Sequence, residues 1–389
     1  MAELTKLERV KILCDPELKS EVIDQIVNNL SGVVVSHQGK YLWLGTDELT
    51  AIERFTRLED GGFGKHERFE FKKFIDDFDE DKGEVDVEGI DYCDGFLWII
   101  GSHSSKRKKV KIARDKFQVE RKELKQIERQ ENRYLLARIP VNEAGDLEAN
   151  SPQRAWLKRH GSNNSLTKAL AKDEYLDIPQ IIAGEDNNSL AGKEFYFYLP
   201  SKENGLDIEG LAVRGNKVFI GLRGPVLRGI AILLEIEVEA GSSNQLNLKA
   251  IGDNGREYKR HFLDLDGLGI RELCLEGDSG DLLILAGPTM DRDGAHSLFR
   301  LKQPLTLKDN SLSSQKNEQL EYLGDIPHGK KRDRAEGLTL YGGAKSILVV
   351  YDSPAEERLI AGERDTVVGV DADVFPYCDQ EKSEGENFS

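Results

Sequence analysis

A hairpin-like segment recurs along this 389-residue chain, and the recurrence restricts the fold more than any other feature. Each copy has an alternating run of apolar and polar residues, a turn containing Gly, Asn or Asp, and a second run that is almost wholly apolar. This pattern is typical of a β-hairpin whose second strand is buried. The five visible copies begin with residues 30–35, 85–92, 206–213, 268–275 and 334–340.

Alignment of the copies at their turns places one residue of each copy in a single column. The column residues are Ser31, Glu88, Glu209, Arg271 and Glu336, separated by 57, 121, 62 and 65 positions. Three spacings are close to 60, which is longer than a minimal propeller blade of ~40–45 residues but compatible with long loops. The 121-residue gap holds either a degenerate repeat or an insertion. Proline-free, helix-prone runs at 106–130 and 165–175 favour an insertion.

Further strand-like segments follow most of the hairpins. They lie at 51–55, 66–74, 133–139, 194–199, 229–238, 259–265, 297–301, 319–323 and 365–371. The last copy lacks a fourth strand, which residues 8–14 would supply by pairing the start of the chain with its end. We therefore predict an all-β fold, a β-propeller of five blades with helical insertions within 103–132 and 150–185. The alternative is six blades, with the sixth hidden within 145–200.

A closed propeller forms one domain, so we expect a single domain over residues 1–377 and a flexible acidic tail at 378–389. The 37 glycines agree with many hairpin turns. Cysteines at 14, 93, 274 and 378 are far apart and lack zinc-type spacing, so we expect buried thiols.

The charge balance excludes one broad class of function. Lys and Arg number 54 against 70 Asp and Glu, a net charge of −16, which excludes a generally basic nucleic-acid binder. No segment approaches ~18 consecutive apolar residues, and the N-terminus lacks the apolar core of a signal peptide. We therefore expect a cytoplasmic protein that does not enter membranes.

The start of the first strand and the end of the second strand of a hairpin lie at the same end. If the first strands are innermost, the column and the residues that leave the second strands converge on one face around the axis. Carboxylates from separate blades suit Ca²⁺ or Mg²⁺, so Glu88, Glu209 and Glu336 are candidate metal ligands. The alternative is that they bond backbone amides or pair with Arg271 and so fix the register of the blades.

Residues at the strand exits are candidates for ligand binding and proton transfer. Arg223 and Arg228 bracket a Gly-Pro turn that could present two guanidinium groups to a phosphate or carboxylate, or they pair with the glutamates. His103 and Asp352 are the candidates for proton transfer, although a lone histidine is more often structural. The remaining candidate ligand-binding residues on this face are Arg271, Asp47 and Glu48.

Three segments resemble a bacterial family, domain of unknown function 3616. They are KENGLDIEGLA at 202–212, GLRGPVLRG at 221–229, and VDVEGI at 85–90 with GSHS at 101–104. The resemblance covers residues 30–375 and implies a propeller fold. More distantly, the Glu-Gly repeats look like those of phytase-like and esterase-like propellers. Those proteins use a full carboxylate cluster where this chain has Ser31 and Arg271.

Two functions from different classes fit these patterns. The leading one is binding of a small anionic ligand, such as a phosphoester, on the Glu- and Arg-lined face, with metal-assisted hydrolysis of an ester or phosphoester bond. The alternative is a non-catalytic protein-interaction scaffold that uses the 103–132 insertion as its partner arm.

Overall fold

The computed structural model describes residues 3–108, 124–176, 199–277, 279–290, 292–342, 346–363 and 366–377. Its two described α-helices are α1 (Ser20–Asn28) and α3 (Ser165–Leu170). Its described strands are β1 (Glu8–Leu13), β2 (Leu30–Ser36), β3 (Tyr41–Thr46), β4 (Ala51–Arg57), β5 (Phe63–Glu70), β6 (Val87–Cys93), β7 (Phe96–Gly101), β8 (Lys106–Arg107), β9 (Ile127–Glu128), β10 (Leu136–Pro140), β11 (Ala155–Leu157), β12 (Asp207–Arg214), β13 (Lys217–Gly224), β14 (Ala231–Ala240), β15 (Gln245–Leu248), β16 (Lys259–Leu263), β17 (Gly269–Leu275), β18 (Leu282–Gly287), β19 (His296–Leu301), β20 (Ser311–Ser313), β21 (Leu320–Ile326), β22 (Arg334–Leu340), β23 (Ser346–Asp352), β24 (Leu359–Ala361) and β25 (Val367–Pro376).

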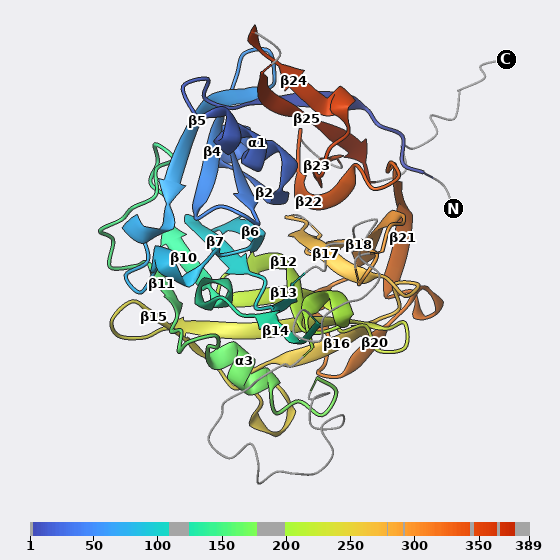
Figure 1. The fold of residues 1–389 in the computed structure, drawn as a ribbon. Helices are drawn as coiled ribbons and strands as arrows, with labels where there is room; N and C mark the ends of the chain where they lie inside the picture. The colour runs from blue at the N-terminus through green and yellow to red at the C-terminus, as the bar shows by residue number, and fades with distance from the viewer. Residues whose placement is uncertain are drawn as a thin grey trace, which may run out of the picture.

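The strands form antiparallel groups that radiate from a central axis (Figure 1). The groups are β2-β3-β4-β5, β6-β7-β10-β11, β12-β13-β14-β16, β17-β18-β19-β21 and β22-β23-β25-β1. The first strand of each group, which opens one of the sequence repeats, lies innermost (Figure 1). The fold is an all-β β-propeller.

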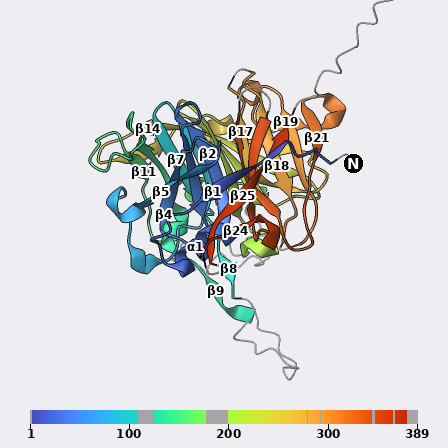
Figure 2. The same ribbon diagram turned by 90° about the horizontal axis from the view of Figure 1, so that it is seen from above.

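The ring closes where the two ends of the chain meet. β1 pairs antiparallel with β25, from Glu8 opposite Val374 to Leu13 opposite Gly369. A parallel pair, Ile12 opposite Phe63, also joins β1 to β5. Figure 2 shows β1 and β25 side by side. The N-terminal strand therefore completes the group that the last strands of the chain begin.

The hydrophobic core lies between neighbouring groups of strands. Every residue of β3 and β18 is buried, because both faces of these second strands are covered by adjacent strand groups. One cluster of buried side chains joins Trp43 of β3 to Leu97 and Ile99 of β7. Burial of apolar surface at about 25 cal/mol per Å² makes these contacts the main stabilisation of the ring.

Both expected helical insertions differ from the prediction in part. In the described part of the first, residues 106–107 pair with 127–128 as the antiparallel strands β8 and β9, because ion pairs of Lys106 with Glu84 and of Arg107 with Glu203 tie this hairpin to the ring. In the second, α3 is helical as expected, but residues 155–157 form β11.

β11 is the fourth strand of its group, a role that the sequence pattern had assigned to residues 194–199. β11 pairs with β10 on one side and with β15 on the other, which fixes it as a strand. Residues 194–198 and the expected tail at 378–389 lie outside the described residues. Neither α1 nor α3 is long and apolar enough to cross a membrane. The cytoplasmic location stays a prediction.

Candidate functional site

Each innermost strand carries a β-bulge at its column residue. The register between the first two strands of each group shifts across Ser31, Glu88, Glu209, Arg271 and Glu336. A bulge inserts one extra residue into a strand and changes the direction in which the side chain of that residue points. The five equivalent bulges therefore explain why this column, rather than its neighbours, lines the centre of the ring.

Glycine follows the bulge in four of the five inner strands. A Cβ on Gly32 would lie 2.7 Å from Ile90 Cγ1, and a Cβ on Gly89 would lie 2.7 Å from Leu211 Cβ. The absence of a side chain thus allows adjacent inner strands to approach closely. The fifth strand has Glu272 instead, fully buried, with Oε1 accepting from the N–H groups of Leu211 at 3.2 Å and Leu273 at 2.9 Å.

All five column residues line one central cavity of about 210 Å³. The lining is strongly polar, with nine acidic and seven basic side chains among its residues. They are Leu30, Ser31, Asp47, Glu48, Glu84, Asp86, Glu88, Ser104, Lys106, Arg133, Ser201, Lys202, Asp207, Glu209, Arg223, Arg271, Pro288, Arg292, Arg334, Glu336 and Asp352. The structure thus brings together the column and the predicted residues Asp47, Glu48, Arg223 and Asp352.

Two arginines, the buried Arg271 and the partly buried Arg223, separate the carboxylates on one side of the cavity. Arg271 donates to Glu209 Oε2 at 2.5 Å and lies 3.0 Å from Glu336 Oε1. Arg223 lies 2.6 Å from Glu209 Oε1 and donates to Asp207. Charge-assisted pairs of this kind are short and directional. These guanidinium groups therefore position the glutamates, which is the alternative that the sequence had left open for Arg223 and Arg271.

Two carboxyl groups face the same cavity without such a cation. Glu88 makes no ion pair within the described part of the chain, and burial together with Glu209, Asp86 and Asp207 raises its pKa well above the usual range. Burial, followed by the charges of Asp86 and Asp352, raises the pKa of Asp47 to about 8. Asp47 Oδ1 is buried and has no hydrogen-bond partner in the protein. Burial and the neighbouring like charges thus favour the protonated form of both carboxyl groups.

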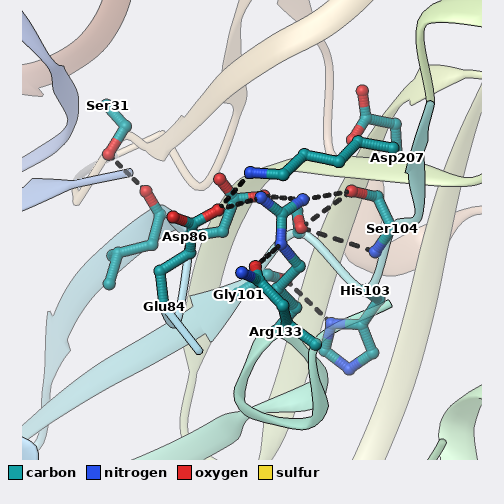
Figure 3. Close-up of polar contacts among 12 residues, drawn as sticks. Ser31, Glu84, Asp86, Gly101, His103, Ser104, Arg133 and Asp207 are labelled. Carbon is teal, nitrogen blue, oxygen red and sulfur yellow. Dashed lines mark hydrogen bonds and ion pairs between the residues drawn. The ribbon is translucent and has the colours of Figure 1, made fainter. Parts of the chain in front are cut away.

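A third network supports the wall beside Glu88. Arg133 lies 2.7 Å from Asp86 Oδ2, donates to Glu84, and donates to Ser104 Oγ at 3.1 Å (Figure 3). Lys106 donates to the same Glu84 carboxylate at 2.7 Å. These contacts of Glu84 tie the base of the β8–β9 hairpin to the cavity. Elsewhere on the wall, Ser31 donates to the carbonyl of Val87 on the neighbouring inner strand.

Two residues of the predicted site do not line the cavity. His103 is 1% exposed, its Nδ1 lies 2.8 Å from the carbonyl oxygen of Gly101, and its Nε2 lies 2.8 Å from Asn164 Nδ2. Figure 3 shows its ring directed toward Gly101. Burial lowers its pKa to about 4, so both nitrogens of a neutral ring are used structurally. Arg228 is exposed in the turn before β14 and is also absent from the lining.

The three candidate metal ligands share the cavity but do not form a metal-binding group. Within the described ranges, no cluster of three or more His, Cys, Asp or Glu side chains is arranged to hold a metal ion. The reason is the bridging Arg271, whose two terminal nitrogens already neutralise Glu209 and Glu336. Glu88 is the candidate ligand that this arginine does not bridge.

The sequence reasoning missed a second set of lining residues. Asp86, Asp207 and Arg334 each lie two positions before a column residue, and all three line the cavity. They face polar residues at the ends of the second strands, as Asp207 faces Arg223 and Arg334 faces Asp352. The signal was present in the aligned repeats, because residues two positions apart in a strand lie on the same face.

Comparison with known proteins gives a family and a set of structures with a similar shape. The model of the family described as "Protein of unknown function (DUF3616)" matches residues 29–369. No curated protein matches the chain.

Three solved structures illustrate the similarity in shape. The α-L-arabinofuranosidase PaAbf62A of Podospora anserina, in complex with cellotriose, has a TM-score of 0.38 at 9% identity, over 97% of this chain and 99% of that one. The PQQ-bound aldose sugar dehydrogenase of Streptomyces coelicolor has a TM-score of 0.35 at 13% identity, over 95% and 100%. The β-propeller domain of Myceliophteria thermophila Cps50 (Swd1) has a TM-score of 0.35 at 9% identity, over 90% and 97%. No residue role is transferred from these proteins.

Proposed function

This chain belongs to the DUF3616 family of proteins of unknown function, and we propose from its cavity that it binds a small hydrophilic ligand with an anionic group and hydrolyses an ester or phosphoester bond in it. The observation that carries the proposal is the coexistence of two kinds of carboxyl group. Glu209 is engaged as a carboxylate by two guanidinium groups, whereas burial and like charges raise the pKa values of Glu88 and Asp47. Titratable groups held in different protonation states are the usual basis of acid–base catalysis.

The proposal gives each kind of group a role. Glu88 or Asp47, protonated near neutral pH, donates a proton to the leaving oxygen. Glu209 orients the attacking water, and Arg223 and Arg271 hold Glu209 in place. Asp352 is the candidate that accepts the proton lost by the attacking water, since it lines the cavity with Oδ2 3.5 Å from Arg334. His103 and Arg228 take no part in this scheme because neither lines the cavity.

A divalent cation remains part of the proposal as a question for experiment. Ca²⁺ or Mg²⁺ would take oxygen ligands, and Glu88 and Asp47 are two lining carboxyl groups without an arginine partner among the described residues. A cation there would favour their ionised forms and would supply Lewis-acid chemistry. Elemental analysis of the purified protein measures whether it is retained.

We also infer that the ring consists of five blades in one domain. The antiparallel groups of strands support this count, with β1 and β25 in the blade that joins the chain ends. β15 pairs with both β14 and β11, so it links two blades and does not begin a sixth blade.

A partner-binding scaffold is the second candidate function. The observation that favours it is the β8–β9 hairpin, which extends away from the ring in Figure 2 and carries basic residues in an acidic protein. Its partner would be a protein with an acidic surface.

The decisive test is hydrolysis of a panel of esters and phosphoesters by the full chain. The variant Glu88→Gln should lower kcat about 10²- to 10⁴-fold, because it removes a proton donor without changing volume. The variant Glu356→Gln, at an exposed glutamate outside the cavity lining, is the matched control and should keep full activity. Absence of turnover across the panel would leave the scaffold as the function to pursue.

A further inference from the structure

The wall of the cavity has a different construction where the β17–β21 group contributes to it. The other groups place polar side chains two positions before the column or at the end of the second strand, such as Asp207 opposite Arg223. In the β17–β21 group both positions are glycine, and Gly269 pairs with Gly287. The backbone of Arg223 takes the space that a side chain would fill at Gly269, and His296 of the third strand takes the space at Gly287.

His296 lies directly against Gly287 of this pair. A Cβ built on Gly287 would lie 2.6 Å from His296 Cδ2, 2.9 Å from His296 Nε2 and 3.0 Å from Arg271 Cγ. The imidazole and the side chain of Arg271 therefore adjoin the same point of the wall. No residue larger than glycine fits at 287 while both side chains keep these positions.

Several nitrogen atoms at this point have no protein partner. His296 is 2% exposed, and neither Nδ1 nor Nε2 makes a hydrogen bond in the protein. Nε of Arg271 is also buried without a partner. Buried polar atoms are nearly always hydrogen-bonded, and each exception costs about 1–3 kcal/mol. These three nitrogens are therefore candidates to bond a group from outside the chain.

The charge around these nitrogens selects the kind of partner. Arg271, Arg334 and Arg292 line this part of the cavity, and the ring of His328 lies 6.3 Å from that of His296 between centroids. Burial, followed by the charges of Arg271, His328 and Arg334, lowers the pKa of His296 to about 3. A neutral imidazole still donates one N–H, and an entering anion would offset the repulsion from its basic neighbours.

We propose that His296, Arg271 and Arg334 form a subsite for the anionic oxygen group of the ligand, a phosphate or a carboxylate. The subsite rests on the proposed function, since it receives the charged end of the ligand whose scissile bond lies toward Glu88. One N–H of His296 and Nε of Arg271 donate to the anion, and Arg334 at the cavity surface supplies a guanidinium charge. His296 and Arg334 thereby raise the affinity for the ligand, whereas the carboxyl groups of the proposed hydrolysis act on the bond that is cleaved.

The test is titration of the full chain with inorganic phosphate and, separately, with acetate, followed by calorimetry. We expect saturable binding of at least one anion, weakened about tenfold or more by His296→Gln and by Arg334→Gln. Arg332→Gln is the matched control, because Arg332 is an exposed arginine two residues away that pairs with Glu356 and does not line the cavity. The anion affinity of this control should lie within twofold of that of the parent protein.

A second measurement covers the case in which His296→Gln does not fold. Arg334 is 29% exposed, so its substitution should leave the fold intact, and ¹⁵N-histidine spectra of the parent protein follow the imidazole signals during the titration. The subsite is supported if the chemical shift of a buried imidazole changes until the anion saturates the protein, and if Arg332→Gln leaves the size of this change the same. Unchanged histidine signals, or equal affinity in Arg334→Gln, would overturn it. Ester turnover with unchanged signals would reject the subsite alone, whereas anion binding without turnover would reject the proposed hydrolysis alone.

Discussion

The two sides of the central cavity hold their buried carboxyl groups in different ways. On the arginine-bridged side, Arg223 and Arg271 separate Asp207, Glu209 and Glu336 by short ion pairs. On the carboxyl side, Asp47 and Glu88 have no cation partner among the described residues, and burial raises the pKa of each. Burial also raises the pKa of Glu336 to about 8 and the pKa of Asp207 to about 7, so the two sides differ in their cations and not in the direction of these shifts. One ring of bulges thus presents an arginine-bridged part and a part without a bridging cation.

The largest effect should come from removal of the central bridge. Arg271→Ala leaves Glu209 and Glu336 buried and facing each other, and loss of one partner from a buried ionic network typically costs 3–5 kcal/mol. We expect the free energy of unfolding in urea at pH 7 to fall by about that amount. Arg332→Ala, at an exposed ion pair, should change it by less than about 0.5 kcal/mol. Similar small losses in both variants would mean that the bridge does not hold the inner strands together.

An intermediate effect that depends on pH should come from the carboxyl side. Because the pKa of Asp47 in the folded protein is about 8, above its unfolded value, its contribution to stability is complete at low pH and is lost as the pH rises from about 4 to 8. Asp47→Asn removes this loss and should stabilise the protein at pH 9 by roughly 1–3 kcal/mol relative to the parent, and by much less at pH 4. Unfolding curves of both proteins at the two pH values measure the difference. A stability difference that does not vary with pH would contradict the assignment.

The smallest effect concerns Glu272, the residue that replaces the glycine of the other inner strands. Burial raises the pKa of Glu272 well above the usual range, and its Oε2 has no partner in the protein. Burial therefore favours the neutral form of this side chain, and Glu272→Gln keeps the acceptor for the N–H groups of Leu211 and Leu273. We expect the free energy of unfolding at pH 7 to change by less than about 1 kcal/mol. A loss of several kcal/mol in urea unfolding would show that Glu272 is ionised and paired.

The convergence of the column residues could be predicted from the sequence because hairpin geometry alone places them at one end of the ring. The partners of these residues could not be predicted in the same way. Whether Arg223 binds a ligand or Glu209 depends on distances across the cavity, and a repeat alignment contains no such distances. The sequence favoured His103 because it follows a strand, yet its burial against Gly101 and Asn164 depends on a segment sixty residues away.

Errors in strand assignment have a related physical cause. Residues 155–157 form a strand because neighbours on both sides supply backbone partners, and three residues are too few for a periodic pattern to be visible. His296 escaped notice because it stands in a third strand, outside the hairpins that repeat. It packs against Gly287 at the end of the second strand of its group.

The pairing of β1 with β25 has a consequence for synthesis of the protein. β1 leaves the ribosome long before its antiparallel partner, residues 367–376, has been made. Until then, the hydrogen-bonding edge of the first strand is open to wrong partners. Ring closure should therefore be the late, slow step of folding, because its contacts span nearly the whole sequence. A nascent chain that stops short of residue 367 should need protection from aggregation.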